Sequence, residues 1–447
     1  MPKQQKRANT KASAKKSATK KIAKKPAAAK APKSSMFTKV VTLYKDQGDY
    51  FQIDKKYKKM GLSTRAIHAG NSHCQLHGGV VPSIDLSTTY IQPAPGVTTS
   101  AFDYTRCGNP TVLAFQRNLA SLEGANYAFA TSSGMAATIS VLSLLKQGDH
   151  ILCIDDVYGG TQRYLRKILI PNAGIHLDLI DCTDLKKVEK AIQKNTKIMW
   201  IESPTNPTLK CTDIAAVAKI CKKHNVFLAI DNTFMSPVLQ HPLELGADIV
   251  MHSVTKYIGG HSDVVAGALM FNSRELYDKL YFNIKSMGTM IAPFDAFIAL
   301  KGSKTLALRA ERAASNALAI AKHLEKHPKI TKVVYPGLPS HPHHKIAKRN
   351  AADPKTQSGG SGMLSFYVRG GQKQCDTFLS ALSIITLAES LGGVESLIEA
   401  PAVMTHGSVP AEHRAKLGIL DNFVRMSAGV ENVEDLIADL DAALKKI

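Results

Sequence analysis

Short apolar runs alternate with helix-period segments along the middle of the chain. Residues 134–146 and 214–224 have the apolar spacing of helices. The apolar runs are short enough to be buried strands, and they lie at residues 151–154, 176–180, 198–201, 226–230 and 249–252. Continuous apolar strands that alternate with helices are typical of a parallel sheet with helices on both faces. The pattern therefore predicts an α/β domain with a mostly parallel central sheet.

The pattern changes beyond about residue 293. A long helical segment at 309–325 is followed by two strand-like runs at 363–368 and 423–427. The last segment, 433–444, is amphipathic, with Leu436, Ile437, Leu440 and Leu444 on one face. We expect these elements to form a smaller C-terminal α+β domain.

The N-terminal quarter has no comparable period. Prolines 82, 93 and 95 and repeated Gly and Thr residues predict an irregular segment over residues 62–110, with the folded body beginning near Leu62. We therefore divide the chain into a tail (1–35), a linker and N-terminal arm that reaches a partner subunit (36–110), a larger α/β domain (111–300) and the smaller domain (301–447).

The tail carries much of the net charge of +21, because its first 34 residues contain eleven Lys, one Arg and no acidic residue. Such a segment has too few apolar residues to fold by itself, so we expect a disordered arm. Three interpretations stay open: non-specific binding to polyanions such as nucleic acid, organellar or nuclear targeting, and a solubilising extension.

Cysteine usage and hydropathy bear on the compartment. The seven cysteines are scattered singly without a CxxC pair, which favours a reducing compartment, and we expect a cytoplasmic protein. No run of 18 apolar residues is present, so no membrane span is predicted. His341, His343 and His344 cluster around a proline-broken turn without further ligands, so we expect no metal site.

Polar residues follow the predicted strands at their carboxyl ends, where ligands bind in open parallel sheets. These residues are Asp155, Asp156, Asp181, Glu202, Ser203, Asp231, Asn232 and the segment 253–256. Lys256 directly follows a buried strand, so partial desolvation should lower the pKa of its amine and allow it to form a Schiff base. Asp231, at another strand end, would suit a pyridinium nitrogen, so the pair points to pyridoxal phosphate (PLP). A lone lysine at a strand end is more often a surface cation; the combination favours the cofactor site.

Nine sequence motifs are similar to those of a known enzyme family: YTRCGNPT (104–111), SSGMAAT (132–138), DDVYGGT (155–161), ESPTNPT (202–208), DNTFMSP (231–237), SVTKYIGGHSD (253–263), YPGLPSHP (335–342), LAESLGG (387–393) and MTHGSVP (404–410). Over residues 62–446 the chain resembles the Cys/Met-metabolism family of PLP-dependent enzymes, and within it the cystathionine γ-lyase branch. The resemblance implies the PLP-dependent transferase fold of type I and a homotetramer built from two dimers.

The same resemblance implies roles around the cofactor. Lys256 would be the Schiff-base lysine and proton shuttle, Asp231 would pair with the ring nitrogen, and Tyr158 would stack on the ring and relay a proton. The phosphate would be bound at a helix N-terminus and by hydroxyls. The residues implied for the phosphate are Ser133, Gly134, Met135, Ser253 and Thr255, together with Tyr104 and Arg106 from the neighbouring subunit.

Arg425 matches the arginine that binds the substrate carboxylate in this family, with Asn206 as its polar partner. The remaining residues implied for the substrate are Ser390, Thr405, Glu389, Asp103 and Arg163, with Glu389 at the distal amino group. The activity implied is the cleavage of L-cystathionine to L-cysteine, 2-oxobutanoate and ammonia, with hydrogen sulfide from cysteine as a side reaction.

Three positions bear on the branch of the family. Gly160 stands where methionine γ-lyase-like sequences have a cysteine, which argues against that activity. Asp103 stands where γ-lyases usually have a glutamate, and Cys107 also departs from the common pattern. Asp103 therefore leaves cystathionine γ-synthase, which joins cysteine to an activated homoserine, as an alternative. The basic tail leaves a second alternative, a nucleic-acid-associated protein that acts through this tail.

Overall fold

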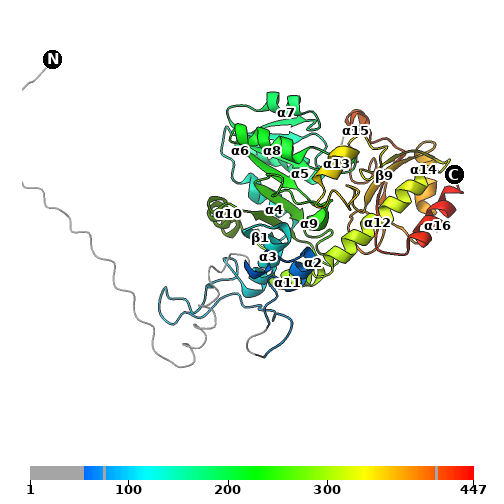
Figure 1. Cartoon of the computed structure of the whole chain (residues 1–447). Helices are drawn as coiled ribbons and strands as arrows, with labels where there is room; N and C mark the ends of the chain where they lie inside the picture. Colours follow the sequence, from blue (N-terminus) through cyan, green and yellow to red (C-terminus); the bar gives the residue numbers. More distant parts are fainter. Residues whose placement is uncertain (1–54, 74–76, 408–410) are drawn as a thin grey trace, which may run out of the picture.

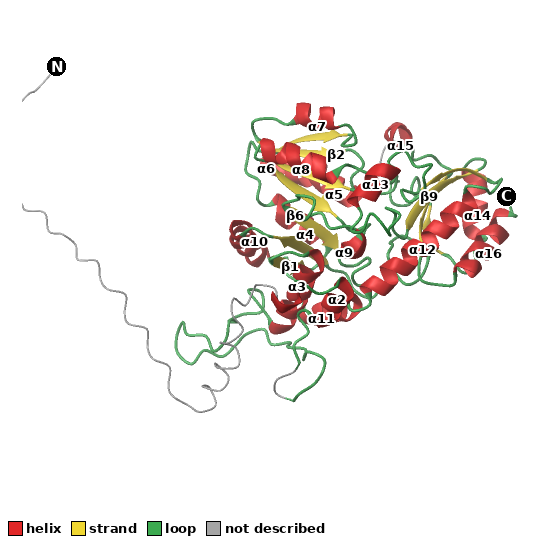
Figure 2. Cartoon of the chain, in the orientation of Figure 1, coloured by secondary structure: helices red, strands yellow, loops and turns green. Residues whose placement is uncertain are grey.

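The computed structural model describes residues 55–73, 77–407 and 411–447 (Figure 1). The tail, most of the predicted linker and the last three residues of MTHGSVP lie outside the described residues. Two sheets organise the described chain. The larger one is built from strands between residues 127 and 271 and the smaller one from strands between residues 330 and 427, and the long helix α12 (Leu306–Leu324) runs from one to the other (Figure 2).

The larger sheet has seven strands in the order β1-β7-β6-β5-β4-β2-β3. Their bounds are β1 Tyr127–Thr131, β2 His150–Ile154, β3 His176–Ile180, β4 Thr196–Glu202, β5 Phe227–Asp231, β6 Ile249–Ser253 and β7 Gly267–Phe271. β7 pairs antiparallel with both of its neighbours, whereas the pairs from β6 to β3 are all parallel. The five predicted strands are present, and the mostly parallel sheet is confirmed.

Helices cover both faces of this sheet (Figure 2). Side chains alternate between the faces, so Phe129 and Leu269 contact one apolar cluster while Ala130 and Met270 contact the other. The first cluster includes residues of α4 (Gly134–Leu142), α7 (Leu185–Ala191), α8 (Ile214–Lys223) and α10 (Arg274–Met287). The second includes residues of α3 (Pro110–Glu123), α9 (Ser236–Leu239), α11 (Pro293–Ser303) and α12.

Short helices complete the first half of the chain. They are the 3-10 helix η1 (Lys55–Tyr57), α2 (Leu62–His68), α5 (Gly159–Tyr164), the π-helical turn η2 (Leu165–Leu169) and α6 (Ile170–Ala173). The helix α2 corrects the prediction that all of residues 62–110 are irregular. Its seven residues pack on α3 through Ala66, and the prolines that suggested an irregular segment come only later.

The smaller sheet has the strand order β10-β11-β12-β9-β8. The elements of this part are β8 Ile330–Val334, α13 His344–Asn350, β9 Met363–Val368, α14 Gln372–Ser380, β10 Thr386–Leu387, β11 Leu397–Glu399, α15 Ala411–Leu417, β12 Phe423–Ser427 and α16 Val433–Leu444. The strands predicted at 363–368 and 423–427 and the helix predicted at 433–444 are present. They form an α+β unit, as expected from the change in periodicity.

Arg309 in α12 fixes the segment that follows β6. Its guanidinium is buried and donates to the carbonyl oxygens of Tyr257 at 2.6 Å, Gly302 at 2.8 Å and Ile258 at 3.3 Å. Burial lowers the pKa of this guanidinium to about 10, which leaves it charged at neutral pH. Because Tyr257 directly follows Lys256, these hydrogen bonds hold the backbone of the predicted cofactor lysine.

We expect Arg309→Ala to lower the free energy of unfolding by about 3 kcal/mol, because it leaves buried carbonyl groups without a donor. Arg312→Ala is the matched control, since Arg312 lies on the exposed side of the same helix. Thermal or urea unfolding of both variants measures the difference. Equal stability of the two variants would contradict the role given to Arg309.

Candidate active site

The N-terminus of α4 lies beside the end of β6. Ser133 caps the helix by accepting a hydrogen bond from Ala136 N at 3.0 Å. A Cβ atom on Gly134 would lie only 3.0 Å from Ser253 Oγ, so the glycine leaves the backbone of this helix end open beside that hydroxyl. Free backbone N–H groups at a helix N-terminus attract anions. The structure therefore brings Ser133, Gly134 and Ser253 together, as the sequence predicted.

Thr255 is turned toward the chain that leads into β7. Its hydroxyl oxygen donates to Ala266 O at 3.1 Å and accepts from Ala266 N at 3.1 Å. These two hydrogen bonds fix the turn between β6 and Lys256. In this arrangement the Thr255 hydroxyl already has its partners, and Ser253 is the hydroxyl nearer to the α4 N-terminus.

The Lys256 side chain points toward the loop between β10 and β11 of the small sheet. Its Nζ donates to Ser390 Oγ at 2.7 Å. Burial and the positive charge of Arg425 lower the pKa of the Lys256 amine to about 8, while Glu399 and Glu389 oppose this shift. An amine with this pKa is a far better nucleophile at neutral pH than an ordinary lysine.

Two carboxylates, one buried and one half-buried, lie next to each other at the ends of β4 and β5. Glu202 and Asp231 are direct neighbours in the register of these strands. Burial raises the pKa of both, and the charge of Asp231 raises that of Glu202 further. Asp231 Oδ1 accepts from Thr233 N at 2.9 Å, but two adjacent carboxylates away from bulk water still favour a cationic partner. A protonated ring nitrogen is such a partner.

Tyr158 connects this carboxylate pair to α4. Its backbone N–H donates to Glu202 Oε1 at 2.9 Å, directly before α5 begins. A Cβ atom on Gly160 would meet the Tyr158 ring at 2.5 Å and the sulfur of Met135 at 3.2 Å. The tyrosine ring therefore lies beside Met135 and the helix N-terminus, and it is 44% exposed. A ring in this position is able to cover a flat ligand.

Arg425 lies on β12 and is 3% exposed. Its guanidinium donates to Asn206 Oδ1 at 3.0 Å and to Ser390 O at 2.8 Å, and it forms an ion pair with Glu399 Oε1 at 3.0 Å. Since Ser390 also accepts from Lys256, Arg425 and Lys256 are connected through one residue. The structure thus brings Arg425, Asn206, Ser390 and Lys256 together.

Glu399 is a site residue that the sequence reasoning missed. It lies on β11 opposite Arg425 in the register of the small sheet, and its side chain is fully buried. Burial raises the pKa of its carboxyl group, while Arg425 and a hydrogen bond from the Thr405 hydroxyl at 2.9 Å lower it. An acidic residue inside the apolar run LIEAPAV was the available signal.

Glu389 and Thr405 lie at the same end of the site. The charge of Glu389 acts on Lys256, Arg425 and Glu399, and its side chain is exposed. Thr405 reaches the site through its hydrogen bond to Glu399. Arg163 lies on the exposed side of α5, and no contact joins it to Lys256 or Arg425.

Tyr104 and Arg106 lie elsewhere in this chain. The guanidinium of Arg106 lies over the Tyr104 ring and donates to Lys285 O in α10 at 2.6 Å. Asp103 directly precedes them, and its carboxylate accepts from Tyr104 N at 2.7 Å. The described contacts of these three residues do not include Lys256, so within one chain they are separate from the residues around it.

The arrangement fits PLP, the cofactor that the sequence predicted. An open helix N-terminus beside Ser253 suits a phosphate, and the adjacent carboxylates of Glu202 and Asp231 suit a ring cation. Lys256 supplies the third feature that PLP needs, an amine with a lowered pKa that is able to react with the cofactor carbonyl. Among the described residues, no group of three or more His, Cys, Asp or Glu side chains is placed to hold a metal ion.

Comparison with known proteins agrees with this arrangement. Residues 63–445 match the model of the Cys/Met metabolism PLP-dependent enzyme family. A cystathionine γ-lyase from Dictyostelium discoideum is 51% identical over 385 residues, which cover 86% of this chain and 98% of the relative. A cystathionine β-lyase from Coxiella burnetii is 47% identical over 388 residues, covering 87% of this chain and 98% of the relative.

A solved structure is also similar. The cystathionine γ-lyase from Lactobacillus plantarum, determined in complex with L-serine, superposes with a TM-score of 0.82 at 41% identity, and the match covers 87% of this chain and 99% of that structure's chain. The family match spans both sheets and all the residues around Lys256. The chain therefore belongs to the Cys/Met metabolism PLP-dependent enzyme family.

Proposed function

We propose that the chain is a cystathionine γ-lyase, which cleaves L-cystathionine to L-cysteine, 2-oxobutanoate and ammonia and releases hydrogen sulfide from cysteine as a side reaction. The observation that carries this proposal is the chain of contacts from Lys256 through Ser390 to Arg425. It places a nucleophilic amine beside a buried guanidinium, which suits an α-amino acid substrate. The name of the Dictyostelium relative supports the choice of cystathionine.

The cofactor would be held at three points. Lys256 would bind its carbonyl carbon, Asp231 its ring nitrogen, and the α4 N-terminus with Ser253 its phosphate. Met135 would take part through its backbone, and Thr255 would support the turn that carries Ser253. PLP when bound supplies an electron sink for the bonds at the substrate Cα. The ring of Tyr158 would lie against the cofactor plane.

The substrate carboxylate would bind at Arg425. A guanidinium binds a carboxylate through paired hydrogen bonds, and the low exposure of Arg425 strengthens this interaction. Asn206 and Ser390 fix the orientation of the guanidinium. Glu389, exposed at the mouth of the site, would meet the distal ammonium group, and Thr405 would keep Glu399 in place.

Lys256 would also move the protons. Its amine, once free, has a pKa of about 8, so at neutral pH it exchanges a proton readily. The Ser390 hydroxyl holds Nζ on the side of the site where Arg425 binds the carboxylate. The Tyr158 hydroxyl would relay a proton from the opposite side of the ring.

We further propose that the site is completed by a second copy of the chain. Residues 77–109 form loops that extend beyond α3 and α11 (Figure 1), and they expose Val80, Leu86 and Ile91 at 76%, 66% and 70%. An apolar surface of this kind suits a protein interface. Tyr104 and Arg106 lie on this arm and would bind the phosphate of the neighbouring subunit, with two such dimers forming a tetramer.

We also propose a role for the basic tail and a cellular compartment for the enzyme. The eleven lysines of the first 34 residues would bind polyanions without sequence preference, and the enzyme would act in the cytoplasm. In the described part of the chain, no helix has both the length and the apolar character to cross a membrane.

The decisive experiment is a product assay with L-cystathionine and the full chain loaded with PLP. We expect 2-oxobutanoate, cysteine and ammonia in equal amounts, and Lys256→Ala should lose activity by at least about 10³-fold together with the visible absorbance of the bound cofactor. Lys322→Ala, a surface change in α12, is the control. Full turnover in Lys256→Ala, or pyruvate with homocysteine as the products, would reject the proposal.

The low pKa of Lys256 predicts a pH dependence of cofactor capture. Only the unprotonated amine reacts, so the rate at which cofactor-free protein captures PLP should rise with pH through a midpoint of about 8. Glu399→Gln removes a negative charge that raises the pKa of Lys256, so the midpoint should move to lower pH. Stopped-flow absorbance measures both midpoints. A midpoint near that of an ordinary lysine would show that burial and Arg425 do not lower the pKa of Lys256.

Cystathionine γ-synthase remains the second candidate function because the chain has Asp103 where γ-lyases usually have a glutamate. If the carboxylate at this position selects between cleavage and synthesis, Asp103→Glu should raise kcat/KM for cystathionine cleavage relative to that for joining cysteine to an activated homoserine. Asp85→Glu, on the same arm, is the control. Kinetics that are unchanged with both substrates would remove Asp103 as a determinant of the reaction.

A further inference from the structure

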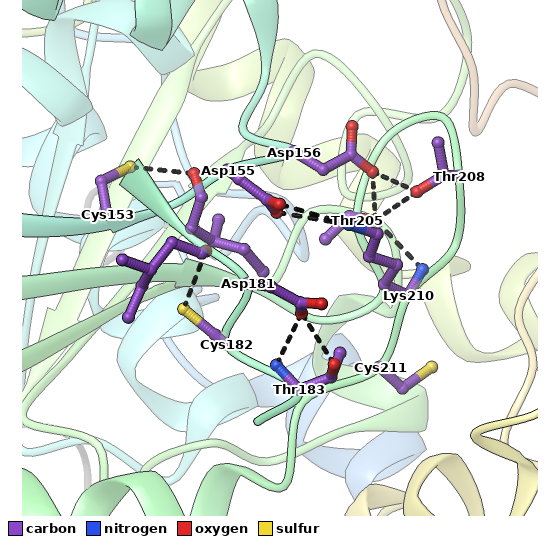
Figure 3. A network of polar contacts seen from close by, with 12 residues as sticks. Cys153, Asp155, Asp156, Asp181, Cys182, Thr183, Thr205, Thr208, Lys210 and Cys211 are labelled. Carbon is purple, nitrogen blue, oxygen red and sulfur yellow. Dashed lines mark hydrogen bonds and ion pairs between the residues drawn. The ribbon is translucent and has the colours of Figure 1, made fainter. Parts of the chain in front are cut away.

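Asp156 is a buried carboxylate that none of the steps above uses. It is the second residue after β2, two residues before Tyr158, and it is 1% exposed. Its Oδ2 accepts hydrogen bonds from the hydroxyls of Thr205, at 2.6 Å, and of Thr208 (Figure 3). Its Oδ1 is buried without a hydrogen-bond partner. A carboxylate kept in this environment, at a cost in desolvation, needs an explanation.

The two threonines belong to one closed turn. Thr205 N donates to Lys210 O at 3.0 Å, Lys210 N donates to the Thr205 hydroxyl at 3.0 Å, and Leu209 N donates to Thr205 O at 3.1 Å. Asn206 directly follows Thr205 in this turn and accepts a hydrogen bond from Arg425. The position of the turn therefore sets the position of the Asn206 amide.

The small sheet binds the same turn from the other side. Ser365 Oγ donates to Pro207 O at 2.9 Å. Ser365 lies opposite Arg425 in the register of β9 and β12, so this contact is made one strand away from the guanidinium. The turn is thus held by Asp156 from the large sheet and by Ser365 from the small sheet, with Asn206 and Arg425 between them.

Three charged or titratable side chains surround Asp156 in the described structure: Asp155, Lys210 and Glu202. Asp155 and Lys210 form an ion pair at 3.4 Å next to it, and the buried carboxyl of Glu202 lies on the neighbouring strand. Burial raises the pKa of Asp156 to about 6, while the hydroxyls of Thr205 and Thr208 and the charge of Lys210 oppose this shift. Asp156 is consequently ionised at neutral pH and becomes protonated as the pH falls through about 6.

We propose that Asp156 is a positioning residue for substrate binding: it holds the Thr205–Thr208 turn so that Asn206 orients the Arg425 guanidinium toward the substrate carboxylate. It acts through Thr205 and Thr208 and does not touch the substrate. This inference rests on the proposed role of Arg425. Its consequence is that loss of Asp156 weakens carboxylate binding more than it weakens the chemistry at Lys256.

The test compares four variants of the PLP-loaded full chain with L-cystathionine as substrate. Asp156→Ala removes the acceptor, Asp156→Asn keeps an acceptor oxygen, and Thr205→Val with Thr208→Val removes the donors while leaving the acid. Asp278→Asn is the control, because this exposed carboxylate pairs with Arg274 in α10 and does not contact the turn.

We expect Asp156→Ala and the double threonine variant to raise KM by about tenfold or more, with a smaller change in kcat and with the visible absorbance of the cofactor retained. Asp156→Asn should recover part of the loss. In the wild type, kcat/KM should fall as the pH drops through about 6, and this step should be absent in Asp156→Asn. Asp278→Asn should keep the wild-type KM and pH profile.

An unchanged KM in both Asp156→Ala and the double threonine variant would overturn the inference. So would a loss that is confined to thermal stability, which is the result expected from a purely structural role. If Asp156→Ala does not fold, the double threonine variant decides by the same criterion. A wild type that does not cleave cystathionine would reject the proposed function; spectral titration of the same variants with L-serine would then measure carboxylate binding and still decide on Asp156.

Discussion

The buried positive charge of Arg425 is the interaction on which the rest of the site depends. A guanidinium that is 3% exposed must be paired, because an unpaired buried charge is strongly destabilising. Its partners come from three separate parts of the chain: Glu399 from the small sheet, Asn206 from the turn after β4, and Ser390 from the segment before β11. Satisfying this one charge joins the two sheets and places Ser390 within reach of Lys256.

The same charge sets the chemistry of Lys256. Arg425 adds to the effect of burial in lowering the pKa of the amine to about 8. At the opposite end, the adjacent carboxylates of Glu202 and Asp231 favour a cation, and the N-terminus of α4 favours an anion. A ligand with a phosphate, a protonated ring nitrogen and a reactive carbonyl carbon matches these three environments together, which is why family membership and the electrostatics of the site agree.

The sequence predicted those candidate site residues that lie at the ends of strands. Lys256, Asp231 and Tyr158 each lie at or just after the carboxyl end of a strand, and a parallel sheet brings such ends to one edge. Glu399 was missed because its contact with Arg425 depends on the register of a three-residue strand. The link from Asp156 to Asn206 was missed for a similar reason, since a hydrogen bond across 49 residues leaves no periodic pattern. Strands β1 (YAFAT) and β7 (GALMF) were missed because neither contains the Val or Ile residues that mark the five predicted strands.

The most direct test is a crystal structure of the PLP-loaded chain with a bound amino acid that it does not cleave. The structure predicted here has the substrate carboxylate on the guanidinium of Arg425, with Asn206 and Ser390 still bound to it, and the ring nitrogen of the cofactor at Asp231. The arms of a second chain should bring Tyr104 and Arg106 to the phosphate. A carboxylate bound away from Arg425, or a cofactor whose ring nitrogen does not meet Asp231, would contradict this account.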